Sequence, residues 1–168
     1  MRSSHLLNLL HCAADAGSLE AAQLLIDNDV GVNSFDDEKK TPLHYACGSG
    51  SLEVAKLLLS KGAIMDLQDT SSRTPLLYSC SSGNLNLVEY LVSQGASLDA
   101  TTNKGNTALH IACKYGSLRL VQWLVSNGLD MNRANSSDHL PVYYAGLNGF
   151  SDIVEWLETK MTDQSSLK

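Results

Sequence analysis

Hydrophobic and polar positions recur along this chain with a period of 33 residues, and no insertion or deletion interrupts five successive units. One column of the pattern holds only glycine and another holds only leucine. The glycine column consists of Gly17, Gly50, Gly83, Gly116 and Gly149, and the leucine column of Leu25, Leu58, Leu91, Leu124 and Leu157. A fixed period of this length indicates an array of repeated structural units rather than a single irregular core.

The unit that begins at Thr41 predicts two short helices followed by a polar loop. Thr41 is a favourable N-cap for the first helix, and Gly50 supplies the positive φ that commonly ends one. A second helix is expected from Ser51 or Leu52, because apolar residues then recur at the i, i+3 and i+4 spacing of one helical face. The polar stretch 66–73 is expected to turn back toward the next unit.

Helix pairs of this kind cannot cover their own apolar faces and become stable when they stack on neighbours. We therefore expect one domain over residues 1–163, followed by a polar tail over residues 164–168. The expected repeats span about 5–34, 38–67, 71–100, 104–133 and 137–163. Unit one lacks the Thr-Pro start, and Glu158 replaces an outer apolar position in unit five. Both end units therefore have features of caps.

The segment 41–46, which reads T-P-L-H-Y-A, resembles the opening motif of the ankyrin repeat. The segment 107–112, T-A-L-H-I-A, departs from the motif only at the proline, and Leu77 replaces the histidine in the unit between them. The resemblance covers roughly residues 5–163. It implies an all-α ankyrin-repeat solenoid of stacked helix-turn-helix pairs with extended β-hairpin-like loops. It also implies that a concave face and the loop tips bind other proteins, without catalysis.

Composition and charge exclude several classes of partner. The net charge of −6 and pI of about 5.2 argue against nucleic acid, whose phosphates require concentrated Lys and Arg. No run of about 18 apolar residues occurs, so no membrane insertion is expected. The apolar stretch near the start is interrupted by His5, Asn8 and His11 and is too short for a secretory signal. We therefore expect a cytoplasmic or nuclear monomer.

The cysteines and histidines are expected to have structural roles. Cys47, Cys80 and Cys113 share one column, and packed helices lie about 8–10 Å apart, beyond the roughly 7 Å that a disulfide spans. His44 and His110 occupy the histidine position of the ankyrin motif, which implies hydrogen bonds to loop backbone. No nucleophile, metal or phosphate motif is present. We therefore expect no enzyme activity, no cofactor and no metal site.

Binding residues are expected where the repeat itself does not need them. The candidates on the concave face and loops are Tyr45, Arg73, Tyr78, Lys104, Asn106, Ile111, Lys114, Tyr115 and Tyr144. Tyrosine and arginine are enriched in binding hot spots, although these tyrosines could equally fill gaps between adjacent first helices. Residues 67–133 carry four acids and five bases, whereas both flanking segments are net acidic. This pattern predicts a partner segment with acidic residues and an apolar or aromatic anchor.

Two functional interpretations remain open. The first is a non-catalytic protein-interaction module that acts as a scaffold, adaptor or inhibitor. The second is a regulatory or substrate-recruiting segment of a larger signalling enzyme, channel or ubiquitin ligase. In addition, the sequence L-V-S-N-G-L-D-M-N around Asn132 resembles ankyrin sites modified by the oxygen-dependent asparaginyl hydroxylase, and Asn33 fits that pattern less well.

Overall fold

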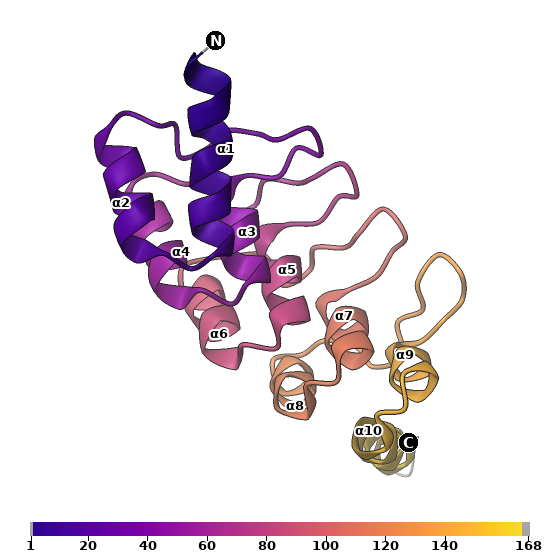
Figure 1. The fold of residues 1–168 in the computed structure, drawn as a ribbon. Helices are drawn as coiled ribbons and strands as arrows, with labels where there is room; N and C mark the ends of the chain where they lie inside the picture. The colour runs from indigo at the N-terminus through magenta and orange to yellow at the C-terminus, as the bar shows by residue number, and fades with distance from the viewer. Residues whose placement is uncertain (1, 166–168) are drawn as a thin grey trace.

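The computed structural model describes residues 2–165, which form ten α-helices (Figure 1). The helices are α1 (Arg2–Asp15), α2 (Leu19–Asp27), α3 (Pro42–Gly48), α4 (Leu52–Ser60), α5 (Pro75–Ser82), α6 (Leu85–Ser93), α7 (Ala108–Tyr115), α8 (Leu118–Ser126), α9 (Pro141–Leu147) and α10 (Ser151–Ser165). They form five consecutive pairs, one for each sequence unit.

The pairs stack in a row, so that each first helix packs on the first helices of its neighbours. Helices α1, α3, α5, α7 and α9 form one layer, and the second helices form the other (Figure 1). Long loops project beyond the first layer. We call the surface made by the first helices and these loops the inner face. The predicted solenoid of helix-turn-helix pairs is confirmed.

Four loops, here called the fingers, share one turn geometry. They comprise residues 36–40, 69–73, 102–106 and 135–139. In the first finger the amide of Asp36 donates to the carbonyl of Lys40 at 3.0 Å, and the amide of Lys39 donates back to the carbonyl of Asp36 at 3.0 Å. The Asp36 carboxylate also accepts from the amide of Lys40 at 2.8 Å. A side chain that mimics a turn in this way fixes a loop without neighbouring strands.

Neighbouring fingers are also bonded to one another. The amide of Thr70 donates to the carbonyl of Glu38 at 2.9 Å, and the amide of Asn103 donates to the carbonyl of Ser71 at 2.9 Å. The same bond joins the last two fingers. The loops are therefore hairpin-like in their turns and linked in series along the inner face.

The core runs through the whole stack, because the repeated leucines point inward from both layers. Leu43, Leu76, Leu109 and Leu124 are each at most 1% exposed. Burying a leucine side chain contributes about 1.5–3 kcal/mol relative to leaving it in water. Because the same positions recur in every unit, each pair depends on its neighbours for this burial.

The two ends differ from the middle. Helix α1 begins at Arg2 and α10 continues to Ser165, so helix extends past the repeat limits expected from the sequence. Residues 164–165 of the predicted tail belong to α10, and residues 166–168 lie outside the described part. Glu158 is exposed on the last helix, at the position where the inner units carry an apolar residue.

Candidate partner-binding pocket

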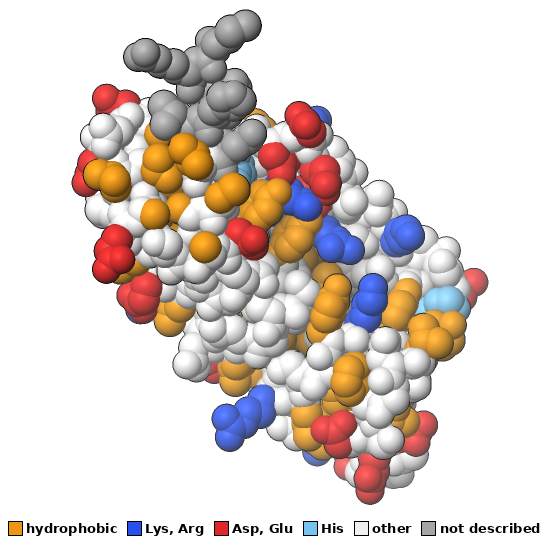
Figure 2. All heavy atoms as spheres, in the orientation of Figure 1, with side chains coloured by type: hydrophobic (Ala, Val, Ile, Leu, Met, Phe, Trp, Pro, Cys, Tyr) orange, Lys and Arg blue, Asp and Glu red, His pale blue; other side chains and the backbone are white. Residues whose placement is uncertain are grey.

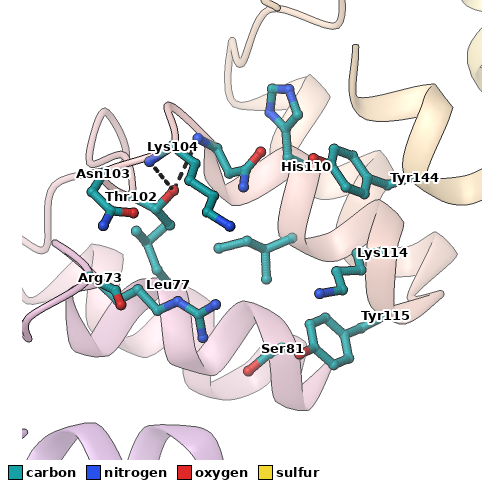
Figure 3. Close-up of a pocket in the computed structure, with 13 residues that line it drawn as sticks. Arg73, Leu77, Ser81, Thr102, Asn103, Lys104, His110, Lys114, Tyr115 and Tyr144 are labelled. Atoms are coloured by element: carbon teal, nitrogen blue, oxygen red, sulfur yellow. Dashed lines mark hydrogen bonds between the residues drawn. The ribbon is translucent and has the colours of Figure 1, made fainter. Parts of the chain in front are cut away.

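A pocket opens on the inner face between units three and four (Figure 3). Its volume is about 340 Å³. Helices α5 and α7, the second and third fingers and one residue of α9 form its wall. The lining residues are Ser71, Arg73, Leu77, Ser81, Thr102, Asn103, Lys104, Asn106, His110, Ile111, Lys114, Tyr115 and Tyr144.

In units two, three and five, a tyrosine from the first helix bonds to the finger that precedes it. The hydroxyl of Tyr45 donates to Oδ2 of Asp36 at 2.7 Å, and that of Tyr78 donates to Oδ2 of Asp69 at 2.7 Å. In unit five the hydroxyl of Tyr144 accepts from the side-chain amide of Asn135 at 2.9 Å. This tyrosine and its finger residue are always nine positions apart, and together they fill the space between helix and finger.

Unit four lacks both members of this pair. Ile111 occupies the tyrosine position and Thr102 occupies the position of the aspartate. The Thr102 hydroxyl accepts from the amides of Lys104 at 3.3 Å and Asn106 at 3.2 Å, so the finger keeps its turn. The Ile111 side chain is too short to reach the finger as a tyrosine would. The pocket lies in the space between Ile111 and this finger.

Leu77 makes a second change to the same wall. The equivalent His44 and His110 donate from Nε2 to the carbonyls of Arg73 and His139, each at 3.1 Å. Leu77 cannot donate to a carbonyl, and it is only 1% exposed at the base of the pocket. The floor of the pocket is therefore apolar at the position where units two and four place an imidazole.

The charges around the pocket are all positive. Arg73, Lys104 and Lys114 extend toward the same hollow from three different elements (Figure 3). Within residues 2–165 none of these three side chains forms an ion pair, and the described lining includes no acidic residue. Figure 2 shows basic side chains along the middle of this face and acidic side chains toward the two ends of the stack.

Two aromatic rings lie beside these cations. The Lys114 Nζ atom is 5.6 Å from the ring centroid of Tyr115, and the Arg73 guanidinium carbon is 5.6 Å from that of Tyr78. The Nε atom of Arg73 is buried and has no hydrogen-bond acceptor within the described residues. The Tyr115 side chain is 50% exposed at the rim. The pocket thus combines unpaired positive charge with apolar and aromatic area.

His44 and the cysteine column are occupied by structural hydrogen bonds or buried in the core. Nδ1 of His44 accepts from the amide of Thr41 at 3.0 Å, so Nε2 carries the proton that it donates to Arg73. Burial lowers the pKa of His44 and raises the pKa of the Cys80 and Cys113 thiols to about 12. Over the part of the chain that the structure describes, no three His, Cys, Asp or Glu side chains gather as a metal site.

None of the helices within residues 2–165 is long and apolar enough to cross a bilayer. A family model for ankyrin repeats, built of three copies, matches residues 4–69, 61–135 and 96–166. The chain belongs to the ankyrin repeat family. No curated protein matches it. Ankyrin repeats are generally protein–protein interaction modules and typically non-catalytic.

Seven of the nine predicted binding residues line the pocket of this ankyrin repeat stack. They are Arg73, Lys104, Asn106, Ile111, Lys114, Tyr115 and Tyr144. The other two do not line it: Tyr45 lies in unit two, and Tyr78 lies on α5 of unit three. Burial and the hydrogen bond to Asp36 raise the pKa of Tyr45 to about 12, so its hydroxyl stays protonated and bonded to that carboxylate. The geometry thus gives Tyr45 and Tyr78 a packing role in the ankyrin fold.

Several pocket residues were not singled out from the sequence. Leu77 and Thr102 are the most informative, because each replaces a residue that closes the equivalent space in other ankyrin units. The amino-acid sequence contains a signal that could have identified Thr102 together with Ile111. Among units two to five, only unit four replaces both the finger residue and the tyrosine nine positions later by residues that cannot form this hydrogen bond.

The two asparagines considered for hydroxylation have different surroundings. Asn33 donates from its side chain to the carbonyl of Gly62 at 2.9 Å and accepts from the amide of Ile64 at 2.8 Å, so it bridges two ankyrin units. Asn132 is exposed, and its backbone amide donates to the carboxylate of Asp130 at 2.8 Å. Hydroxylation of Asn132 stays a prediction.

Proposed function

We propose that this ankyrin repeat domain is a non-catalytic protein-interaction module that binds its partner through the inner face and the fingers. The supporting observation is the pocket between units three and four, where the repeat pattern is interrupted and three cations converge. In this proposal the protein acts as a monomeric scaffold, adaptor or inhibitor in the cytoplasm or nucleus. The fold needs none of these cations for its own ion pairs, which makes them available to a partner.

The proposed partner presents a segment with acidic residues and an apolar or aromatic anchor. The cations of the inner face would steer the segment and contact its carboxylates. Tyr115 and Ile111 would contact the anchor, because rigid aromatic and apolar area in a partly desolvated pocket contributes most to binding. The acidic side chains toward the ends of the stack would repel acidic segments placed out of register (Figure 2).

A capture experiment from cell lysate tests the proposal. One bait is the wild-type domain, and the second carries Arg73→Glu, Lys104→Glu and Tyr115→Ala. Tyr78 is left unchanged because its hydroxyl holds the second finger. A control bait carries Arg119→Glu and Lys160→Glu, two exposed basic residues on second helices. All baits are checked for folding by circular dichroism.

Proteins held by the wild type and the control bait, and lost by the inner-face variant, are the expected result. Equal capture by all three folded baits would place partner binding elsewhere and reject the inner face as the binding surface.

A further inference from the structure

We infer that the pocket between units three and four is a subsite for one anionic side chain of an extended partner segment, with an apolar neighbour seated beside it. This inference rests on the proposed function and names the chemistry that the site recognises. It follows from comparing the pocket with the equivalent places in units two and three, where the finger carries its own carboxylate.

In the second unit the protein neutralises its own finger. Lys40 forms an ion pair with Glu38 of the same finger at 2.8 Å, and the Asp36 carboxylate lies against the hydroxyl of Tyr45. Both carboxylates also act electrostatically on Lys40 and raise the pKa of that ammonium group against the effect of its burial. The positive charge in this finger therefore has anions within the chain.

The next two fingers lose those anions one after another. Arg73 occupies the position of Lys40 one repeat later, but Ser71 occupies the position of Glu38 and cannot pair with it. In the third finger Lys104 takes the Glu38 position, which inverts the charge, and Thr102 replaces the aspartate. The pocket therefore has a positive charge at the position where the first finger has the Glu38 carboxylate, and it lacks the aspartate that the first two fingers carry.

The side chains that unit four lacks leave both an empty volume and an unbalanced positive charge at the same place. Ile111 leaves empty the space that a tyrosine ring fills in the neighbouring units, and Leu77 gives that space an apolar base. A volume of about 340 Å³ is at the lower end of the roughly 300–1,000 Å³ of ligand pockets, which suits a side chain or two rather than a folded element. A carboxylate or phosphoryl group at the cations, with an apolar residue against Ile111, would fill it.

Charge also selects the class of ligand. A nucleic acid carries closely spaced phosphates and needs an extended basic track. Here a group of basic side chains lies along the middle of the inner face, and acidic side chains lie toward both ends (Figure 2). A protein segment with one or two anionic side chains fits this distribution.

The probe that tests the inference is a bead-displayed library of random heptapeptides, prepared with and without a phosphoserine among the building blocks. Fluorescent wild-type protein selects binders, and anisotropy then gives Kd for each selected peptide and for its Glu→Gln counterpart. We expect an acidic residue next to an apolar one, and about a tenfold or larger loss of affinity when the charge is removed. A preference for phosphoserine over Glu would identify a phosphoryl ligand, and the reverse a carboxylate.

The variant Ile111→Tyr fills the pocket and leaves every cation in place, and the pair Thr102→Asp/Ile111→Tyr restores the arrangement of units two and three. Both are expected to weaken peptide binding at least about tenfold without lowering the unfolding temperature. Arg119→Glu on α8 is the matched charge control and should leave Kd unchanged.

An empty selection, a selection without enrichment of acidic residues, or equal affinity for wild type and Ile111→Tyr would overturn the inference. Selected peptides that lack an acidic residue but no longer bind the Tyr115→Ala variant would overturn the inference and leave the proposed function intact. Equal capture of partners by the inner-face bait described above would instead reject the proposed function itself.

Discussion

Nε2 of His44 lies 3.1 Å from the carbonyl oxygen of Arg73, so a ring that belongs to one repeat fixes the finger of the next. Its Nδ1 accepts from the amide of Thr41 in its own unit. One neutral imidazole therefore joins the start of a helix to the loop that supplies a pocket cation. His110 makes the same pair of bonds between units four and five.

Acid should destabilise the stack through these two rings. Burial lowers the pKa of His44 and His110 in the folded state below the ordinary value of 6.5. A lowered histidine pKa means that the unfolded chain binds protons first, so the free energy of unfolding falls as the pH drops below about 6.5 and continues to fall to the folded-state pKa values. Urea denaturation between pH 8 and pH 5 measures this.

The variant His44→Leu/His110→Leu, which copies the residue found at position 77, is the control for that measurement. Its free energy of unfolding should change less between pH 7 and pH 5 than that of the wild type. Equal slopes in the two proteins would show that other groups cause the acid sensitivity.

Tyr78→Phe should cost stability, because the hydroxyl that it removes donates to the Asp69 carboxylate, whose residue is 7% exposed. Leaving a buried acceptor without its donor costs about 1–3 kcal/mol. Tyr115→Phe is the matched control, since that side chain is half exposed, and its effect should lie within about 0.5 kcal/mol. Equal urea midpoints for the two variants would contradict a packing role for Tyr78.

Replacing Gly116 by alanine should destabilise the protein more than replacing Gly149 by alanine. Both have a positive φ, 79° and 77°. A Cβ on Gly116 would overlap the ring of Phe150, whereas a Cβ on Gly149 meets no atom within 4 Å in the described structure. Gly149→Ala should cost about 1–2 kcal/mol from backbone strain alone, and Gly116→Ala a further 1–3 kcal/mol or so from overpacking. Thermal unfolding of both variants tests this order.

Asn132 and Asn33 should differ as substrates of an asparaginyl hydroxylase. The exposed side chain of Asn132 is open to an enzyme, whereas the amide of Asn33 is bonded on both sides to the next unit. Peptide mass spectrometry of protein from human-type cells should show the mass of one added oxygen at Asn132 and none at Asn33. Its absence at Asn132 would end the hypothesis.

The helix pairs and the left-handed glycines could be predicted from the sequence, because they depend on local patterns that recur five times. Grouping Arg73, Lys104 and Lys114 on one face also followed from the repeat register. The different roles of Tyr78 and Tyr115 could not be predicted in this way. Tyr78 is held by a hydrogen bond from its helix to the second finger, and the sequence does not describe the turn of that finger. The length of α10 was missed because its last turns are polar and carry no apolar period.

The backbone bonds between fingers have a consequence for binding thermodynamics. Loops that close over a partner lose conformational entropy when they bind, at roughly 1–2 kcal/mol for each residue that becomes fixed. Here the amides of Thr70, Asn103 and Ser136 already tie each finger to the one before it. That entropy is lost during folding, so a partner meets a preorganised rim and its contact energy is retained as affinity.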